Sequence, residues 1–79
     1  MEECYIVVHR NYADGCMAHA FRNEEDARKD VEDDKRDIVK SLLEQGYTPR
    51  VTDGQDSSEV YVPDSGIYYE WEIIGSSIQ

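Results

Sequence analysis

The pattern of apolar and polar residues predicts two β-hairpins with one long helix between them. Residues 4–10 and 16–22 are rich in β-branched and aromatic residues, and the segment between them includes an Asp-Gly pair typical of hairpin turns. Residues 59–63 and 67–74 form the second pair of predicted strands. The Pro-Asp-Ser-Gly sequence that separates them favours a type I turn.

A single helix is predicted over residues 23–45. Asn23 can serve as its N-cap, acidic residues crowd the first turn, and Gly46 can end the helix in a left-handed conformation. At 100° per residue, several apolar side chains fall within about 60° of one another and form a narrow stripe that should face the sheet. These residues are Ala27, Val31, Ile38 and Leu42.

The element order β-β-α-β-β predicts an α+β fold with one antiparallel four-stranded sheet and a single helix packed across one face. Residues 1–79 are expected to form a single domain, because no repeat, linker or low-complexity segment divides them. The connector after the helix should contain a short extended piece at residues 50–52. Residues 75–79 are expected to fray.

The turn of the first hairpin also predicts a register. With Arg10 opposite Cys16, one face of the hairpin carries small and β-branched side chains at its centre. On this face Val8 lies opposite Ala18, and Ile6 lies opposite Ala20. The helix is expected to pack here, because the two alanines leave room for it.

The other face of the sheet carries larger side chains, and this arrangement would leave them uncovered. They are Tyr5, Val7, Met17, Phe21, Tyr69, Trp71 and Ile73. A patch of this size exceeds what monomers usually expose. We therefore expect a partner protein or a second copy, as in a homodimer, to cover this face.

Charge narrows the range of partners. The 79 residues include 18 Asp and Glu against 8 Lys and Arg, for a net charge of −10. Such a charge repels nucleic acid and anionic membranes and attracts basic protein surfaces. We expect a cationic partner, and no direct contact with nucleic acid or a membrane. Without a long apolar run or a secretory signal pattern, a cytoplasmic location is expected.

No catalytic, metal-binding or cofactor-binding motif is recognisable. Cys4 and Cys16 should lie about 20 Å apart in the hairpin, at about 3.3 Å per residue, too far for a disulfide. Strand alternation places both on the face opposite His9 and His19, which argues against a zinc site or a Cys-His nucleophile pair. The acidic loop 53–59 lacks the spacing of a calcium-binding loop. We expect no metal, no cofactor and no enzymatic activity.

The main functional candidate is a row of acidic side chains beside the apolar stripe of the helix. This carboxylate row consists of Asp26, Asp30, Asp33, Asp37 and Glu44. Its first four members rise by roughly 6, 4.5 and 6 Å along the helix axis, a charge spacing comparable to one strand of nucleic acid. Such carboxylates can occupy Arg and Lys sites built for phosphates. The alternative is a solvated helix face on which Lys29, Arg36 and Lys40 pair with these acids.

A second candidate surface lies on the last predicted strand, where aromatic and acidic residues alternate. Its members are Tyr69, Glu70, Trp71 and Glu72. Tyr and Trp beside acids suit an interface that anchors a cationic partner. The alternative function that follows is a small adaptor that binds a protein, or itself, through the aromatic face of the sheet.

Size, charge and layout together resemble a known class of proteins. A short, strongly acidic β-β-α-β-β chain that carries EEDARKDVEDDKRD and SGIYYEWEII is similar to the small phage-encoded inhibitors that include anti-CRISPR proteins and other DNA mimics. The resemblance covers the whole chain. It implies stoichiometric, non-enzymatic inhibition of a nucleic-acid-binding protein or nuclease complex, in the cytoplasm of the host cell.

Overall fold

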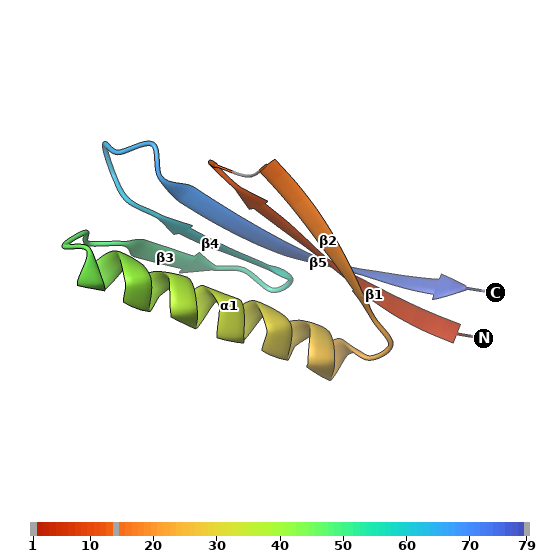
Figure 1. The fold of residues 1–79 in the computed structure, drawn as a ribbon. Helices are drawn as coiled ribbons and strands as arrows, with labels where there is room; N and C mark the ends of the chain where they lie inside the picture. Colours follow the sequence, from red (N-terminus) through yellow and green to blue (C-terminus); the bar gives the residue numbers. More distant parts are fainter. Residues whose placement is uncertain (1, 14, 79) are drawn as a thin grey trace.

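The computed structural model describes residues 2–13 and 15–78, which form one antiparallel sheet with one helix across a face (Figure 1). The elements are β1 (Glu2–Asn11), β2 (Gly15–Phe21), α1 (Glu24–Glu44), β3 (Arg50–Asp53), β4 (Ser57–Tyr61) and β5 (Tyr68–Ile78). The strands lie in the order β2-β1-β5-β4-β3, and every neighbouring pair is antiparallel. The predicted α+β class is confirmed.

The prediction of four strands was wrong, because the sheet has a fifth strand at one edge. The short extended piece expected at 50–52 is most of β3, which pairs with β4 from Arg50 opposite Tyr61 to Asp53 opposite Ser58. A tight turn joins the two strands, in which the backbone N–H of Gly54 donates to the carbonyl of Ser57 at 2.8 Å. Pairing with β4 turns a four-residue segment of modest β propensity into a strand.

The centre of the sheet is the pairing of β1 with β5. These strands pair along their whole length, from Asn11 opposite Tyr69 to Glu2 opposite Ile78. Residues 75–78, which were expected to fray, therefore continue β5. Residue 79 of that prediction lies outside the described residues.

The predicted register of the first hairpin is confirmed. Arg10 lies opposite Cys16, Val8 opposite Ala18, and Ile6 opposite Ala20. The other face of the hairpin consequently carries Val7, His9, Met17, His19 and Phe21.

Helix α1 begins and ends as its sequence predicts. The side-chain carbonyl of Asn23 accepts a hydrogen bond from the backbone N–H of Asp26 at 2.8 Å, which caps the first turn. Gly46 has a φ of +90° and donates to the carbonyl of Leu43 at 3.1 Å, so a left-handed residue follows the last turn. No helix in the described part of the chain is long and apolar enough to cross a membrane.

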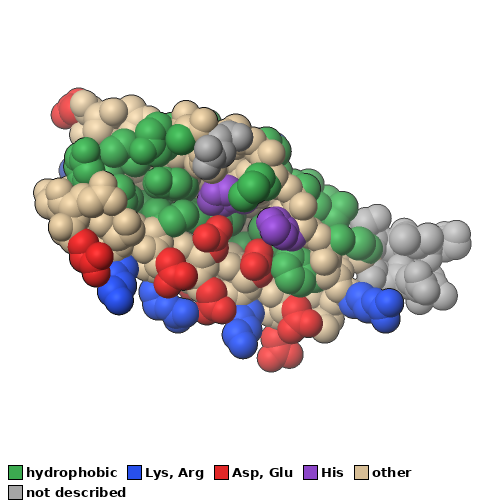
Figure 2. All heavy atoms as spheres, viewed as in Figure 1, with side chains coloured by type: hydrophobic (Ala, Val, Ile, Leu, Met, Phe, Trp, Pro, Cys, Tyr) green, Lys and Arg blue, Asp and Glu red, His purple; other side chains and the backbone are tan. Residues whose placement is uncertain are grey.

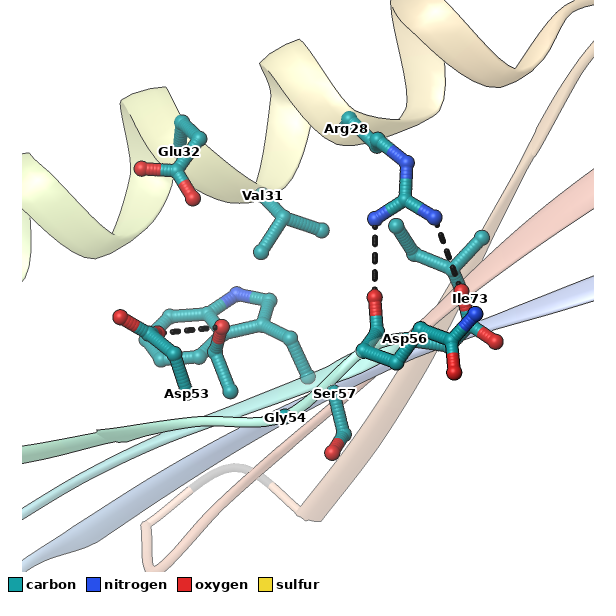
Figure 3. A pocket seen from close by; sticks show the side chains of 11 residues that line it. Arg28, Val31, Glu32, Asp53, Gly54, Asp56, Ser57 and Ile73 are labelled. Carbon is teal, nitrogen blue, oxygen red and sulfur yellow. Dashed lines mark hydrogen bonds and ion pairs between the residues drawn. The ribbon is translucent and has the colours of Figure 1, made fainter.

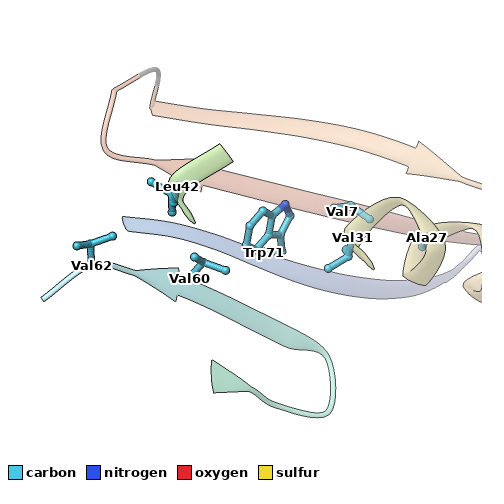
Figure 4. Packing of buried hydrophobic residues seen from close by; sticks show 7 residues of the cluster. All are labelled: Val7, Ala27, Val31, Leu42, Val60, Val62 and Trp71. Carbon is cyan, nitrogen blue, oxygen red and sulfur yellow. The ribbon is translucent and has the colours of Figure 1, made fainter. Parts of the chain in front are cut away.

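The helix packs on the opposite face of the sheet from the one predicted. Its apolar stripe lies over Val7 and Trp71, each only 1% exposed, and not over the face of Ile6, Val8, Ala18 and Ala20. Figure 4 shows the buried core between the two layers, which comprises Val7, Ala27, Val31, Leu42, Val60, Val62 and Trp71. The large aromatic face is covered by the chain's own helix. The premise that the sheet leaves this face uncovered, on which a partner or second copy was expected there, was wrong.

Candidate acidic interface

Charges on the two sides of α1 are segregated. On one side, cationic side chains bind the turn between β3 and β4. Arg28 pairs with Asp56 at 2.8 Å and donates to the carbonyl of Gln55 at 3.0 Å, while Lys35 pairs with Asp53 at 2.9 Å. Hydrogen bonds to Glu24 and Asp56 raise the pKa of Arg28. These contacts fasten the helix to the small hairpin at the edge of the sheet.

The cationic side encloses a small cavity of about 260 Å³ beneath the helix (Figure 3). Val31, Trp71 and Ile73 provide apolar walls. Two ion pairs, Arg28–Asp56 and Lys35–Asp53, lie at its rim. Because Arg28 is bound to Asp56 and Asp53 to Ser58, this cavity has the character of a packing gap between helix and hairpin.

Lys35 is nearly buried, and its charge depends on two carboxylates. Burial lowers the pKa of Lys35, but hydrogen bonds donated to Asp53 and Glu32 outweigh burial, and the pKa lies above its ordinary value. Hydrogen bonds from Lys35 and Ser58 hold the pKa of the Asp53 carboxyl below its usual range. This ion pair is therefore charged at neutral pH and belongs to the structural framework.

On its other side, α1 forms an acidic groove with the β1–β2 hairpin. The groove has a volume of about 330 Å³ and is lined by His9, Met17, His19, Asp30, Asp33, Asp34 and Asp37. No Lys or Arg is among the described residues that line it. Figure 2 shows red carboxylates next to the two purple histidines. The blue cations lie on the outer side of the helix. The groove is therefore an anionic surface whose described lining contains acids and histidines but no Lys or Arg.

The acids of the groove differ in how they are held. Asp33 pairs with Arg36 at 2.8 Å. Asp30 and Asp37 form no ion pair or hydrogen bond with a described side chain, and Lys29 and Lys40 pair with no carboxylate in the described ranges. Of the three cations expected to neutralise the carboxylate row, Arg36 alone does so within those ranges.

The inner wall of the groove is anchored to the core. The indole N–H of Trp71 donates to Asp34 at 3.0 Å, and His9 Nδ1 approaches the same carboxylate oxygen at 3.5 Å. His9 is 6% exposed, and its Nε2 lies 3.4 Å from the side-chain nitrogen of Asn11. Since the Asn11 oxygen accepts from the N–H of Ala13 at 2.9 Å, its NH₂ faces His9 and donates to Nε2. The carboxylate of Asp34 is thus oriented by the buried indole N–H of Trp71.

The structure divides the predicted carboxylate row. Asp30, Asp33 and Asp37 line the groove together. Asp26 lies one turn earlier, where it accepts a hydrogen bond from Asn23 at 3.0 Å, and Glu44 lies exposed in the last turn. The groove therefore contains the middle of the row.

The predicted aromatic and acidic surface on β5 is divided between two faces. Trp71 belongs to the core, and Tyr69 is half-buried against it, with its ring 5.8 Å from that of Tyr12. Glu70 and Glu72 project from the opposite face, where they lie 2.8 and 3.7 Å from Arg10. The hydrogen bond to Glu70 raises the pKa of Arg10. These residues cannot act as one interface.

Several groove residues were missed in the sequence, although their signals are present. They are His9, Met17, His19 and Asp34. A buried Trp usually needs an acceptor for its indole N–H, and Asp34 lies three residues after Val31, at the border of the apolar stripe. The histidines could have been placed only with knowledge of which sheet face the helix covers.

Metal and thiol chemistry have no arranged site in the described residues. No three His, Cys, Asp or Glu side chains there converge closely enough to hold a metal ion. Cys4 and Cys16 are free thiols on the face opposite both histidines. The acidic groove is suited to binding cations through charge and hydrogen bonds. The chain matches no protein-family model, curated protein or solved structure.

Proposed function

We propose that this protein is a non-enzymatic inhibitor that binds a basic, nucleic-acid-handling protein through its acidic groove, as a DNA mimic. The observation that carries the proposal is the separation of charge across α1. Arg28 and Lys35 are bound to the turn between β3 and β4, so they do not neutralise the groove. Asp30 and Asp37 are left available to a partner's Arg and Lys side chains.

The spacing of these acids supports a phosphate-mimicking role. Asp30, Asp33 and Asp37 are separated by about 4.5 and 6 Å along the helix axis. Phosphates of one nucleic acid strand recur about every 3.4 Å of axis, so the roughly 10.5 Å from Asp30 to Asp37 is close to the span of three phosphate steps. Asp34, fixed by Trp71, adds a fourth carboxylate with a defined orientation.

The adaptor alternative loses the surface on which it depended. Trp71 is buried under α1, and Tyr69 packs against the core. A partner could reach the ring of Trp71 only if the helix detached. The groove is the better candidate, because its carboxylates are accessible in the folded protein.

The test is charge reversal in the groove, with a control matched in charge. Replacing Asp30, Asp33 and Asp37 by Lys changes the net charge from −10 to −4, since each reversal adds two units. The control makes three reversals outside the groove, at Glu25, Glu44 and Glu59. Both variants should remain folded, because all six side chains lie off the buried core.

The proteins would be used to capture binders from the cells that produce them, at low and high salt, with duplex DNA as a competitor. The parent should retain a nucleic-acid-binding protein that DNA or about 0.5 M salt releases. The groove variant should bind that protein at least 100-fold more weakly, since breaking desolvated charge pairs costs about 2–5 kcal/mol each. Equal binding by both variants, or a partner that DNA does not displace, would contradict the proposal.

A further inference from the structure

Strand β2 forms an unprotected edge of the sheet. Among the strands that the structure describes it pairs only with β1, and all of its residues except Phe21 are exposed. Its sequence, GCMAHAF, contains no Lys, Arg, Asp, Glu or Pro. Half of the backbone N–H and C=O groups of such a strand point away from its neighbour and are open to another strand.

The opposite edge of the same sheet is protected in the usual ways. Strand β3 has only four residues, follows Pro49, begins with Arg50 and ends with Asp53. Short length, a nearby proline and charged side chains are the features by which proteins discourage edge pairing. The contrast within one molecule singles out β2 as the edge available for association.

We infer that β2 pairs antiparallel with β2 of a second copy of this chain, about a two-fold axis at Ala18. In this register Ala18 meets itself, Met17 lies opposite His19, and Cys16 lies opposite Ala20. Every position of the strand then has a partner, and no two like charges meet. The two sheets join into one continuous sheet.

The lack of charge on β2 favours a second copy as its occupant. A protein of net charge −10 repels its own copies over most of its surface. The uncharged strand is where two copies can approach most closely. Side chains opposite each other in this pairing point to the same face, so both helices and both acidic grooves lie on one side.

The joined grooves give dimerisation a distinctive response to salt. Met17 and His19 lie on the groove side of β2, so the carboxylates of the two copies flank the same seam. Their repulsion is screened as salt rises. Self-association should therefore strengthen about tenfold between about 0.05 and 0.5 M NaCl, whereas binding to a basic partner should weaken. This inference does not depend on the proposed function.

Sedimentation equilibrium of the purified protein, from about 1 µM to 1 mM at both salt concentrations, tests the inference. The parent should form dimers, and Ala18→Lys should weaken association more than tenfold because two lysines would meet at the axis. Thr52→Lys places the same charge on the exposed edge strand β3 and should leave the dimer intact. A parent that stays monomeric throughout would overturn the inference and leave β2 to a strand of another protein.

Cross-linking checks the register. In a Cys4→Ser, Cys16→Ser background, Ala18→Cys should form an intermolecular disulfide when oxidised glutathione accepts the two electrons, because paired Cα atoms lie about 4.5–5.5 Å apart. Ala20→Cys in the same background should not, because the position opposite it, residue 16, no longer carries a thiol. Cross-linking of the second variant and not the first would overturn the two-fold axis at Ala18.

Discussion

Trp71 connects the core to the groove through a single hydrogen bond. Its ring is buried between β5 and α1, and its N–H binds Asp34 at the groove wall. Burying a polar N–H without an acceptor is costly, so the folded state favours the orientation of Asp34 that receives it. A residue first considered as an exposed anchor instead fixes the position of a surface carboxylate.

Lys35 gives the first prediction, at the scale of one ion pair. Lys35→Met keeps most of the buried stem and removes the charge, and we expect the free energy of unfolding at pH 7 to fall by about 1 kcal/mol. Because the pKa of Asp53 is depressed in the folded state, this carboxylate stabilises the fold at pH values above its unfolded pKa near 4. That contribution is lost as the pH falls through the folded pKa. Because the pKa of Lys35 is raised in the folded state, its charge stabilises the fold below about pH 10.4. This contribution is lost at more alkaline pH.

Urea unfolding at pH 3, 5 and 7, followed by the fluorescence of Trp71, measures this effect. The difference between parent and Lys35→Met should be largest at pH 7 and should shrink toward pH 3. Lys40→Met is the control, because Lys40 is exposed and forms no ion pair within the described ranges. A difference that is the same at pH 3 and pH 7 would mean that the stem of Lys35 matters and its charge does not.

Helix α1 depends on its first turn for a defined start. Asn23 both accepts from and donates to Asp26, and Asn23→Ala removes both hydrogen bonds. We expect a loss of about 1 kcal/mol in the free energy of unfolding. Asn23→Ser should restore most of it, because Ser can cap the same N–H. Thermal unfolding followed by circular dichroism compares the three proteins, and equal losses for Ala and Ser would contradict capping by Asn23.

The elements show where sequence patterns were sufficient. The turn between β1 and β2 constrains which residues face each other, and the cap and stop of α1 are local signals, so register and helix bounds were predicted. The choice of sheet face was wrong because Ile6 and Val8 on one side are as apolar as Tyr5 and Val7 on the other. Burial of the larger side chains decided the matter, since covering Trp71 removes more apolar area than covering Ala18.

The same distinction applies to the candidate site. Helical spacing was enough to group Asp30, Asp33 and Asp37, because these residues belong to one element. His9 and His19 come from strands, and their place opposite the acids depends on helix-to-sheet packing, which no local pattern specifies. The split of Trp71 from Glu72 follows strand alternation, which had already placed Tyr69, Trp71 and Ile73 on one face.

The whole molecule carries a charge imbalance that its fold does not relieve. Acids of the groove face one another without Lys or Arg in the lining, and the net charge is −10. We expect the melting temperature to rise by several degrees between about 0.05 and 0.5 M NaCl, because salt screens this repulsion. A gain of about 1 kcal/mol in the free energy of unfolding corresponds to roughly 4–8 °C in a domain of this size.

The triple reversal of Asp30, Asp33 and Asp37 should show a smaller rise, since it removes much of the repulsion that salt screens. Differential scanning calorimetry at a fixed, low protein concentration separates this effect from self-association. A parent that melts at the same temperature at both salt concentrations would show that repulsion within the fold is negligible.

The pairing of β1 with β5 also has a consequence for the time at which the protein can fold. More than fifty residues separate these central strands in the sequence, and Trp71 lies at their junction. During synthesis the β1–β2 hairpin and α1 are made well before β5, so the middle of the sheet stays open until residues 68–78 have left the ribosome. Contacts of such sequence separation close slowly because the intervening chain must first be ordered. The core is therefore completed only when β5 pairs with β1, and the fluorescence of the single Trp in the sequence reports that last step directly.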